Sequence, residues 1–238
     1  MARGIKSKVV MSRMMEGMPR YPNTSVMGMC RGLDYAGTSV FAISGSIAAA
    51  TGGMSILGST VVGCITALGG GTVRDMLWGK APVFWLDEKE YLYMSVANAS
   101  AAFVACATMD PSQAVLQAIL FWGDTLGLGA FCVIGTMYAA RLGCSYVIIM
   151  LCCLVTCTGG GIIRDTLLRR PARVLHAHAE VYAETALGGG SAYMLARTML
   201  LPLQYRALAG MMTCISMRVY ASSHDVRMWS LPQFIQKS

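Results

Sequence analysis

Two arginine–aspartate pairs are the residues of this sequence best suited to hold a small charged solute. Arg74 and Asp75 follow the glycine triplet 69–71, and Arg164 and Asp165 follow the triplet 159–161, so the pattern GGGxxRD occurs twice. A guanidinium can form bidentate bonds with a carboxylate or phosphate, and carbonyls freed where a membrane helix unwinds can coordinate cations. The two motifs therefore predict a binding or permeation site for an ion or a zwitterion.

Both motifs belong to a longer internal duplication with one constant offset, since 159 − 69 = 90. The same offset relates five further identical pairs, which are Asp34 with Asp124, Gly37 with Gly127, Phe41 with Phe131, Gly45 with Gly135, and Glu90 with Glu180. A repeat of this length holds several helices, and in membrane transporters the working site lies where two such repeats meet. We therefore expect the site at the interface between the copies.

The composition is that of a membrane protein. Hydrophobic residues make up 55% of the 238 residues and charged residues only 13%, against about 25% charged residues in soluble domains. The mean hydropathy is +0.54, and residues 35–131 carry too little charge for a water-exposed surface. This pattern predicts an all-α integral membrane protein, with the choice between plasma membrane and organelle membrane left open.

The length of the apolar stretches predicts seven transmembrane helices. They are expected near residues 35–50, 55–77, 91–108, 113–140, 145–168, 178–196 and 203–221. Each copy holds three of these helices, an odd number, so the second copy should enter from the opposite side and form an inverted repeat. The resulting division is a basic disordered tail or targeting segment (1–32), two three-helix repeats (33–110 and 111–200), a seventh helix (201–222) and a C-terminal tail (223–238).

The glycine triplets are expected at membrane depth. From Ser55 to Leu68 there are 14 residues, which span about 21 Å of helix and fall short of the roughly 30 Å hydrocarbon layer. Ser145 to Thr158 repeats this length. Consecutive glycines can bend a helix toward a watery path, or can let two helices pack closely. Because a glycine triplet occurs twice, each time before an arginine, the bend is favoured over close packing.

The polar residues near the triplets complete the predicted site. Adjacent residues of a helix point in different directions, so each arginine is expected to bind carbonyls, a substrate carboxylate or lipid phosphate, and each aspartate to cap or pair with another element. Interfacial anchoring of the arginines is the alternative. The predicted substrate or pore residues are Gly69, Gly70, Gly71, Arg74, Asp75, Gly159, Gly160, Gly161, Arg164 and Asp165, with Phe41, Ser44, Gly45, Phe131 and Gly135 as a constriction or as simple packing.

Other polar residues receive more modest assignments. Asp34 and Asp124 are expected to cap the helices of the first and fourth spans, or to support the site residues from behind. His176, His178, Glu180 and Glu184 could be imagined as a metal site, but an interfacial position is favoured. The nine cysteines form no CxxC pair, so no metal site is expected.

Three segments carry a resemblance to a known family. Residues 41–45 (FAISG), 69–75 (GGGTVRD) and 82–85 (PVFW), with the second GGGIIRD, resemble the glycine-transporter-domain family of small membrane proteins. That family is similar in architecture to the trimeric intracellular cation (TRIC) channels. The resemblance covers roughly residues 33–200 and implies seven helices in inverted repeats, a pore within each protomer and a homotrimer. The second copy departs from it, because PVFW becomes ARVL at 172–175.

These observations leave three functions open. The first is a transporter of a small solute, glycine, in which an arginine and a helix end hold the carboxylate while carbonyls surround the ammonium. The second is a TRIC-like monovalent cation channel, and the third a lipid-bound scaffold. No catalytic constellation or complete P-loop is evident, so an enzyme is not expected. Expected partners are lipids, the solute or cation and further copies of the chain, without nucleic acid; no cofactor is expected apart from a coupling cation such as Na⁺ or K⁺.

Overall fold

The computed structural model describes residues 26–109, 111–172, 181–224 and 226, and every regular element in these ranges is a helix. The helices are α2 (Val26–Ala50), α3 (Ile56–Leu77), α4 (Phe84–Asp87), α5 (Glu90–Met109), α6 (Gln113–Arg141), α7 (Tyr146–Leu167), α8 (Ala183–Thr198) and α9 (Leu203–Ser223). Four of them, α3, α5, α6 and α7, are long and apolar enough to cross a membrane. The prediction of an all-α fold is thus confirmed for the described residues.

The seven expected ranges each overlap one long helix, but only α3, α5, α6 and α7 have the length and hydropathy of membrane spans, so the count of seven spans stays a prediction. Helix α2 begins at Val26 instead of residue 35, and the additional turns bring Arg31 into an ion pair with Glu90 at the start of α5. The short helix α4 was not expected from the sequence. Residues 173–180, which include the predicted start of the sixth span, lie outside the described residues.

Local signals explain the boundaries of the two central helices. The side chain of Ser55 caps α3 by accepting a hydrogen bond from the Gly58 amide at 3.3 Å. Helix α3 ends before Gly79, whose φ of 68° is readily adopted by glycine. Helix α7 starts after Ser145 and ends before Arg169, which also has a positive φ of 53°. Both helices contain 22 residues at an offset of 90.

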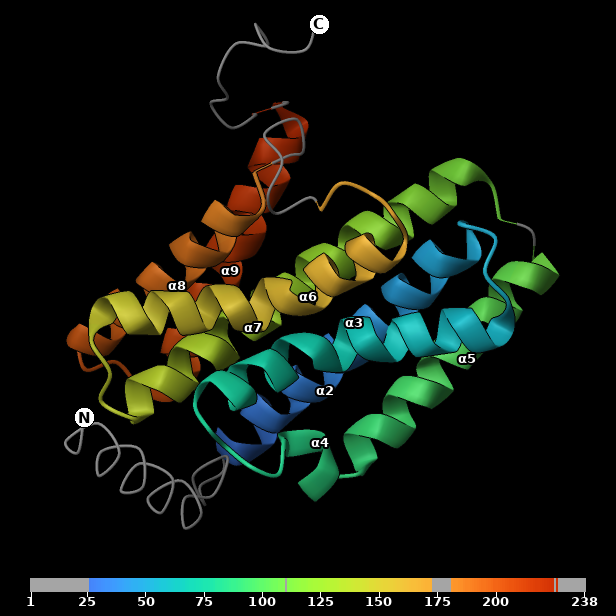
Figure 1. Ribbon diagram of the computed structural model, residues 1–238. Coiled ribbons are helices and arrows are strands. Elements are labelled where there is room, and N and C mark those ends of the chain that lie inside the picture. The colour runs from blue at the N-terminus through green and yellow to red at the C-terminus, as the bar shows by residue number, and fades with distance from the viewer. Residues whose placement is uncertain (1–25, 110, 173–180, 225, 227–238) are drawn as a thin grey trace, which may run out of the picture.

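Four long helices form the centre of the molecule (Figure 1). Helices α2, α3, α6 and α7 lie between α8 and α9 on one side and α4 and α5 on the other. The two copies meet through the packing of α3 on α7 and of α2 on α6. Phe41 of α2 and Phe131 of α6 pack together in this interface, with ring centres 5.2 Å apart. The predicted interface between the two copies therefore lies in the buried core.

Small residues make equivalent contacts in both copies. A Cβ on Gly45 would lie 2.7 Å from the Cβ of Thr66, and one on Gly135 would lie 2.9 Å from the Cβ of Thr156. Contacts this short leave no room for a side chain, so α2 must approach α3, and α6 must approach α7, through glycine. The 90-residue offset thus recurs in the packing of both halves.

Candidate permeation site

The prediction that the glycine triplets break their helices is wrong. Helices α3 and α7 continue through residues 69–71 and 159–161, and none of these six glycines has a positive φ. In a continuous helix the backbone groups stay hydrogen bonded to one another within the membrane. A break would require other partners for the groups that it frees. The glycines cost about 1 kcal/mol each in helix propensity relative to alanine, and close packing of the two helices offsets that cost.

The triplets form the point at which α3 and α7 cross. A Cβ on Gly69 would lie 3.1 Å from the Cα of Gly160, and a Cβ on Gly159 would lie 3.1 Å from the Cα of Gly70. The middle glycines allow the closest approach of all. A Cβ on Gly70 would collide with the carbonyl oxygen of Thr156, and one on Gly160 with that of Thr66. The alternative of close packing therefore describes the triplets.

The third glycine of each triplet differs between the copies. A Cβ on Gly71 would press into the ring of Phe84, which approaches from α4. No described residue lies within 4 Å of the corresponding position on Gly161. The Trp85 indole also donates a hydrogen bond of 3.0 Å to the hydroxyl of Thr72. Helix α4 therefore covers the end of the first motif.

The first arginine is buried and bound to its own neighbour. Arg74 donates from Nε and Nη2 to Oδ1 of Asp75 at 2.9 and 2.8 Å. The Phe84 amide donates to Oδ2 of the same carboxylate at 2.9 Å, and the ring centre of Tyr138 lies 4.5 Å from the guanidinium. The expectation that adjacent residues would not pair is wrong, because the long arginine side chain folds back to the carboxylate when both are buried.

The second arginine is held by two carboxylates. Arg164 donates from Nε to Asp165 at 2.9 Å and from Nη1 to Asp124 at 3.0 Å. The hydroxyl of Ser44 donates to the same oxygen of Asp124 at 3.2 Å. All four residues are buried. Both guanidiniums are thus engaged by carboxylates of the chain itself.

The assignment of Asp34 and Asp124 as helix caps is also wrong. Asp124 lies in the interior of α6, which begins at Gln113 and is capped by Ser112. Asp34 lies well inside α2 and accepts a hydrogen bond of 2.9 Å from the hydroxyl of Tyr91. Both carboxylates are buried, so they serve tertiary contacts between helices.

The predicted constriction residues belong mainly to the core. Phe41, Gly45, Phe131 and Gly135 take part in the contacts between helices described above. Ser44 alone joins the charged cluster, through Asp124. Sequence analysis missed Thr66 and Thr156, although they are also related by the 90-residue offset. Their hydroxyls donate to the carbonyl oxygens of Val62 and Cys152, one helix turn earlier. Their own carbonyl oxygens lie against the opposite glycines.

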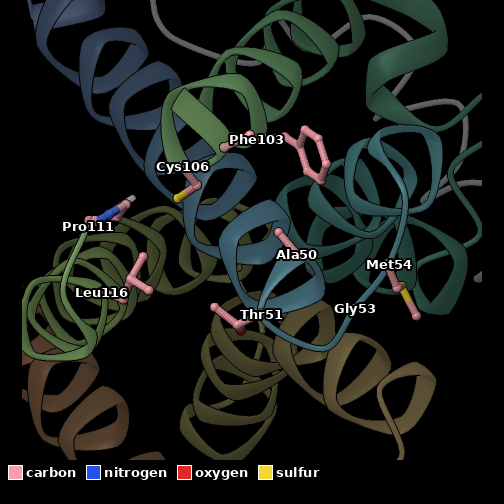
Figure 2. Close-up of a pocket in the computed structure, with 9 residues that line it drawn as sticks. Ala50, Thr51, Gly53, Met54, Phe103, Cys106, Pro111 and Leu116 are labelled. Carbon is pink, nitrogen blue, oxygen red and sulfur yellow. The ribbon is translucent and has the colours of Figure 1, made fainter. Parts of the chain in front are cut away.

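A separate cavity of about 330 Å³ lies at one end of the bundle (Figure 2). It is lined by Ala50, Thr51, Gly53, Met54, Phe103, Cys106, Ala107, Pro111 and Leu116. These side chains are small or apolar and none is charged. The cavity is therefore distinct from the two arginine clusters.

No metal site is formed by the described residues, in which no group of three or more His, Cys, Asp or Glu is arranged around one point. Glu184 lies in the first turn of α8. His176, His178 and Glu180 fall outside the described residues.

Comparison with known proteins gives a family that agrees with this architecture. The family model described as "Glycine transporter" matches residues 31–107 and 121–198, whose starts are 90 residues apart. The chain belongs to this family. It is 35% identical over 202 residues to the UPF0126 membrane protein of Vibrio cholerae, a match that covers 85% of this chain and 81% of the relative. The UPF0126 inner membrane protein YadS of Escherichia coli K12 is 33% identical, over 79% of this chain and 89% of that protein.

Solved structures extend the similarity to the TRIC channels. The TRIC trimeric intracellular cation channel orthologue from Rhodobacter sphaeroides is 29% identical, with a TM-score of 0.77 over 84% of this chain and all of that one. A second structure, from work on conductance through TRIC cation channels, is also 29% identical, with a TM-score of 0.75 over 85% and 97% of the chains. The protein is thus an integral membrane protein with the TRIC fold.

Proposed function

We propose that this protein is a cation channel that conducts monovalent cations through a path within each protomer, and that three chains assemble into a trimer. The observation that carries the proposal is the similarity to TRIC cation channels, which extends over all of one solved chain. The expected glycine carrier becomes the second candidate, and a lipid-bound scaffold the third. Lipids are partners of all three.

The arginine clusters favour the channel over the glycine carrier. A site for a zwitterion needs a cationic group whose hydrogen bonds are directed at the substrate carboxylate. Arg164 directs its hydrogen bonds at Asp124 and Asp165 instead, and Arg74 at Asp75. Because carboxylates compensate these positive charges, a cation passing near them meets a smaller barrier than a bare guanidinium would impose. No cofactor or coupling ion is required by this proposal.

The helix order supports seven spans with inverted repeats. Helices α2, α3 and α5 constitute the first repeat, α6, α7 and α8 the second, and α9 the seventh span. An odd number of spans per repeat reverses the second copy across the membrane. The two arginine clusters then lie on opposite sides of the glycine crossing, each four residues beyond a middle glycine, or about 6 Å along its helix.

The glycine crossing is where we place the closed gate. Backbone atoms of α3 and α7 approach within van der Waals contact there, so no ion passes between the two helices in this state. The clusters at Arg74 and Arg164 flank that contact and mark the two approaches to it. Conduction requires the helices to separate beside the crossing.

Purified protein in liposomes distinguishes the three functions. A K⁺ gradient should produce a current whose reversal potential follows that gradient, and labelled glycine should not accumulate. Gly161→Ala serves as a control that should conduct like the natural chain, because no described residue approaches that position. Glycine accumulation without K⁺ current would overturn the proposal in favour of the carrier, and folded protein without either flux would favour the scaffold.

A further inference from the structure

The cavity in Figure 2 lies where the end of α2, the end of α5 and the start of α6 meet. Ala50 is the last residue of α2, Ala107 lies in the last turn of α5, and Leu116 lies in the first turn of α6. The cavity volume of about 330 Å³ is at the lower end of the range for small-molecule sites, roughly 300–1,000 Å³. Only a small ligand would therefore fit.

The turn that borders the cavity has the same geometry in both copies. Gly53, after α2, and Gly143, after α6, have positive φ values of 82° and 70°. The amide of Gly53 donates to the carbonyl oxygen of Ala50 at 2.9 Å, and the amide of Gly143 donates to that of Ala140 at 3.3 Å. The second copy therefore shows what can occupy the space beside this kind of helix end.

An arginine occupies that space in the second copy. The 90-residue offset relates Ala107 to Arg197, and Nη1 of Arg197 donates to the carbonyl oxygen of Ala140 at 2.8 Å. The Arg197 side chain is half-buried. A cation is favoured at the C-terminus of a helix, because the last carbonyl groups carry partial negative charge. In the second copy the chain itself supplies this cation.

Ala107 leaves the corresponding space open in the first copy. Its methyl group offers no donor to the carbonyl oxygen of Ala50, which, like that of Ala140, has a second lone pair for a hydrogen bond. Phe103 and Cys106, both half-buried, form an apolar wall beside it. We infer that the cavity binds a small organic cation, a guanidinium on a short aliphatic stem, in the place that the side chain of Arg197 holds in the second copy.

A positive charge already lies near the end of α2 and limits the affinity. A Cβ on Gly52 would lie 3.7 Å from Nη2 of Arg170, although neither residue lines the cavity. This guanidinium repels a second cation, so binding should be weak. For n-butylguanidinium, which resembles the arginine side chain, we expect a dissociation constant of about 1–10 mM, the range for so small a ligand. This inference does not depend on what the protein conducts.

Protection of Cys106 from alkylation tests the site in the full chain. At ten times its dissociation constant, n-butylguanidinium should slow the reaction of Cys106 with iodoacetamide about tenfold by mass action, as measured by mass spectrometry of the labelled peptides. Cys144 is the matched control, because it is also half-buried and follows Gly143 at the equivalent end of the second copy. Its alkylation rate should not change. Equal protection of both thiols, or of neither, would overturn the inference.

A neutral compound of the same shape distinguishes a cation site from a merely apolar cavity. At the same concentration, n-butylurea should slow the alkylation of Cys106 less than about twofold, since it lacks the charge that the end of α2 attracts. Equal protection by n-butylurea and n-butylguanidinium would overturn the assignment of a cation.

Substitution of Ala107 tests whether the ligand takes the place of an arginine side chain. At ten times its dissociation constant, n-butylguanidinium should raise the midpoint of thermal unfolding of the natural chain by about 3–6 °C. It should not raise that of Ala107→Arg, in which the chain supplies the cation. Thr108→Arg is the control, because it adds the same charge at an exposed neighbouring position outside the cavity, and it should keep the full shift. A shift that persists in Ala107→Arg would overturn the inference, and if that variant does not fold, the protection of Cys106 decides.

Discussion

Arg74 and Arg164 occupy equivalent positions in the two copies, yet different neighbours stabilise them. Tyr138 of the second copy covers the guanidinium of Arg74, and its equivalent in the first copy is Ala48, which has no ring to offer Arg164. Ser44 of the first copy bonds to Asp124, and its equivalent is Ile134. A duplicated motif can thus keep its sequence while residues of the opposite copy make its two environments different.

The largest effect is expected from removing the second guanidinium. Arg164→Met leaves Asp124 and Asp165 buried without this counter-charge, which should lower the free energy of unfolding by about 3–5 kcal/mol. Adding Asp124→Asn should restore part of the loss, because one uncompensated charge is removed. Denaturant unfolding in detergent measures both variants.

The same second change in the first copy provides the control for that rescue. Asp34 accepts its hydrogen bond from Tyr91, so Asp34→Asn combined with Arg164→Met should recover nothing. Equal recovery from Asp34→Asn and Asp124→Asn would contradict the assignment of Asp124 as the specific partner.

The glycine crossing should give the next largest effects. Gly70→Ala and Gly160→Ala each place a methyl group against a backbone carbonyl of the opposite helix, which should cost about 1–3 kcal/mol by overpacking. Thermal unfolding of the purified variants measures this cost. Two similarly destabilised variants would show that both copies depend equally on the crossing.

Substitution of the third glycine of each triplet should affect stability differently in the two copies. Gly71→Ala meets the Phe84 ring, whereas Gly161→Ala meets no described residue and gains up to about 1 kcal/mol in helix propensity. Thermal unfolding should therefore rank Gly161→Ala above Gly71→Ala. Equal stabilities of Gly71→Ala and Gly161→Ala would contradict the assigned contact between Gly71 and the Phe84 ring.

The smallest effect is expected at the hydrogen bond that joins Trp85 of α4 to Thr72 of α3. Trp85→Phe removes the hydrogen bond to Thr72 and should lower the unfolding free energy by about 1 kcal/mol. Thr72→Val also removes the bond of this hydroxyl to the Leu68 carbonyl, so its loss should be smaller in the Trp85→Phe background than in the natural chain, but not zero. Fully additive losses in this double-mutant cycle would show that the bond contributes nothing.

Much of the fold could be predicted because membrane helices obey simple limits of length and polarity. The apolar stretch at 145–168 gave α7 within one residue at each end. The 90-residue offset also located the interface between the copies. Helix α4 could not be predicted in this way, because four residues carry no periodicity and are held by contacts to Asp75 and Thr72.

The site was predicted less well because its geometry depends on neighbours that are distant in sequence. The motifs identified the glycines and arginines but not their packing, since a glycine triplet suits both a bend and a close approach. The pairing of Arg164 with Asp124 joins residues 40 positions apart. A search for polar residues that share the offset would have drawn attention to Thr66 and Thr156.

The single close contact between α3 and α7 also restricts how these helices can move. Carbonyls pressed against glycines resist sliding, whereas rotation about the line joining the two helices disturbs that contact least. Rotation of α3 against α7 about this central contact would move their ends apart on both sides of the crossing at the same time. A carrier must close one side as the other opens, whereas a channel needs both sides open at once, so rotation about this contact would suit the proposed channel better than the carrier.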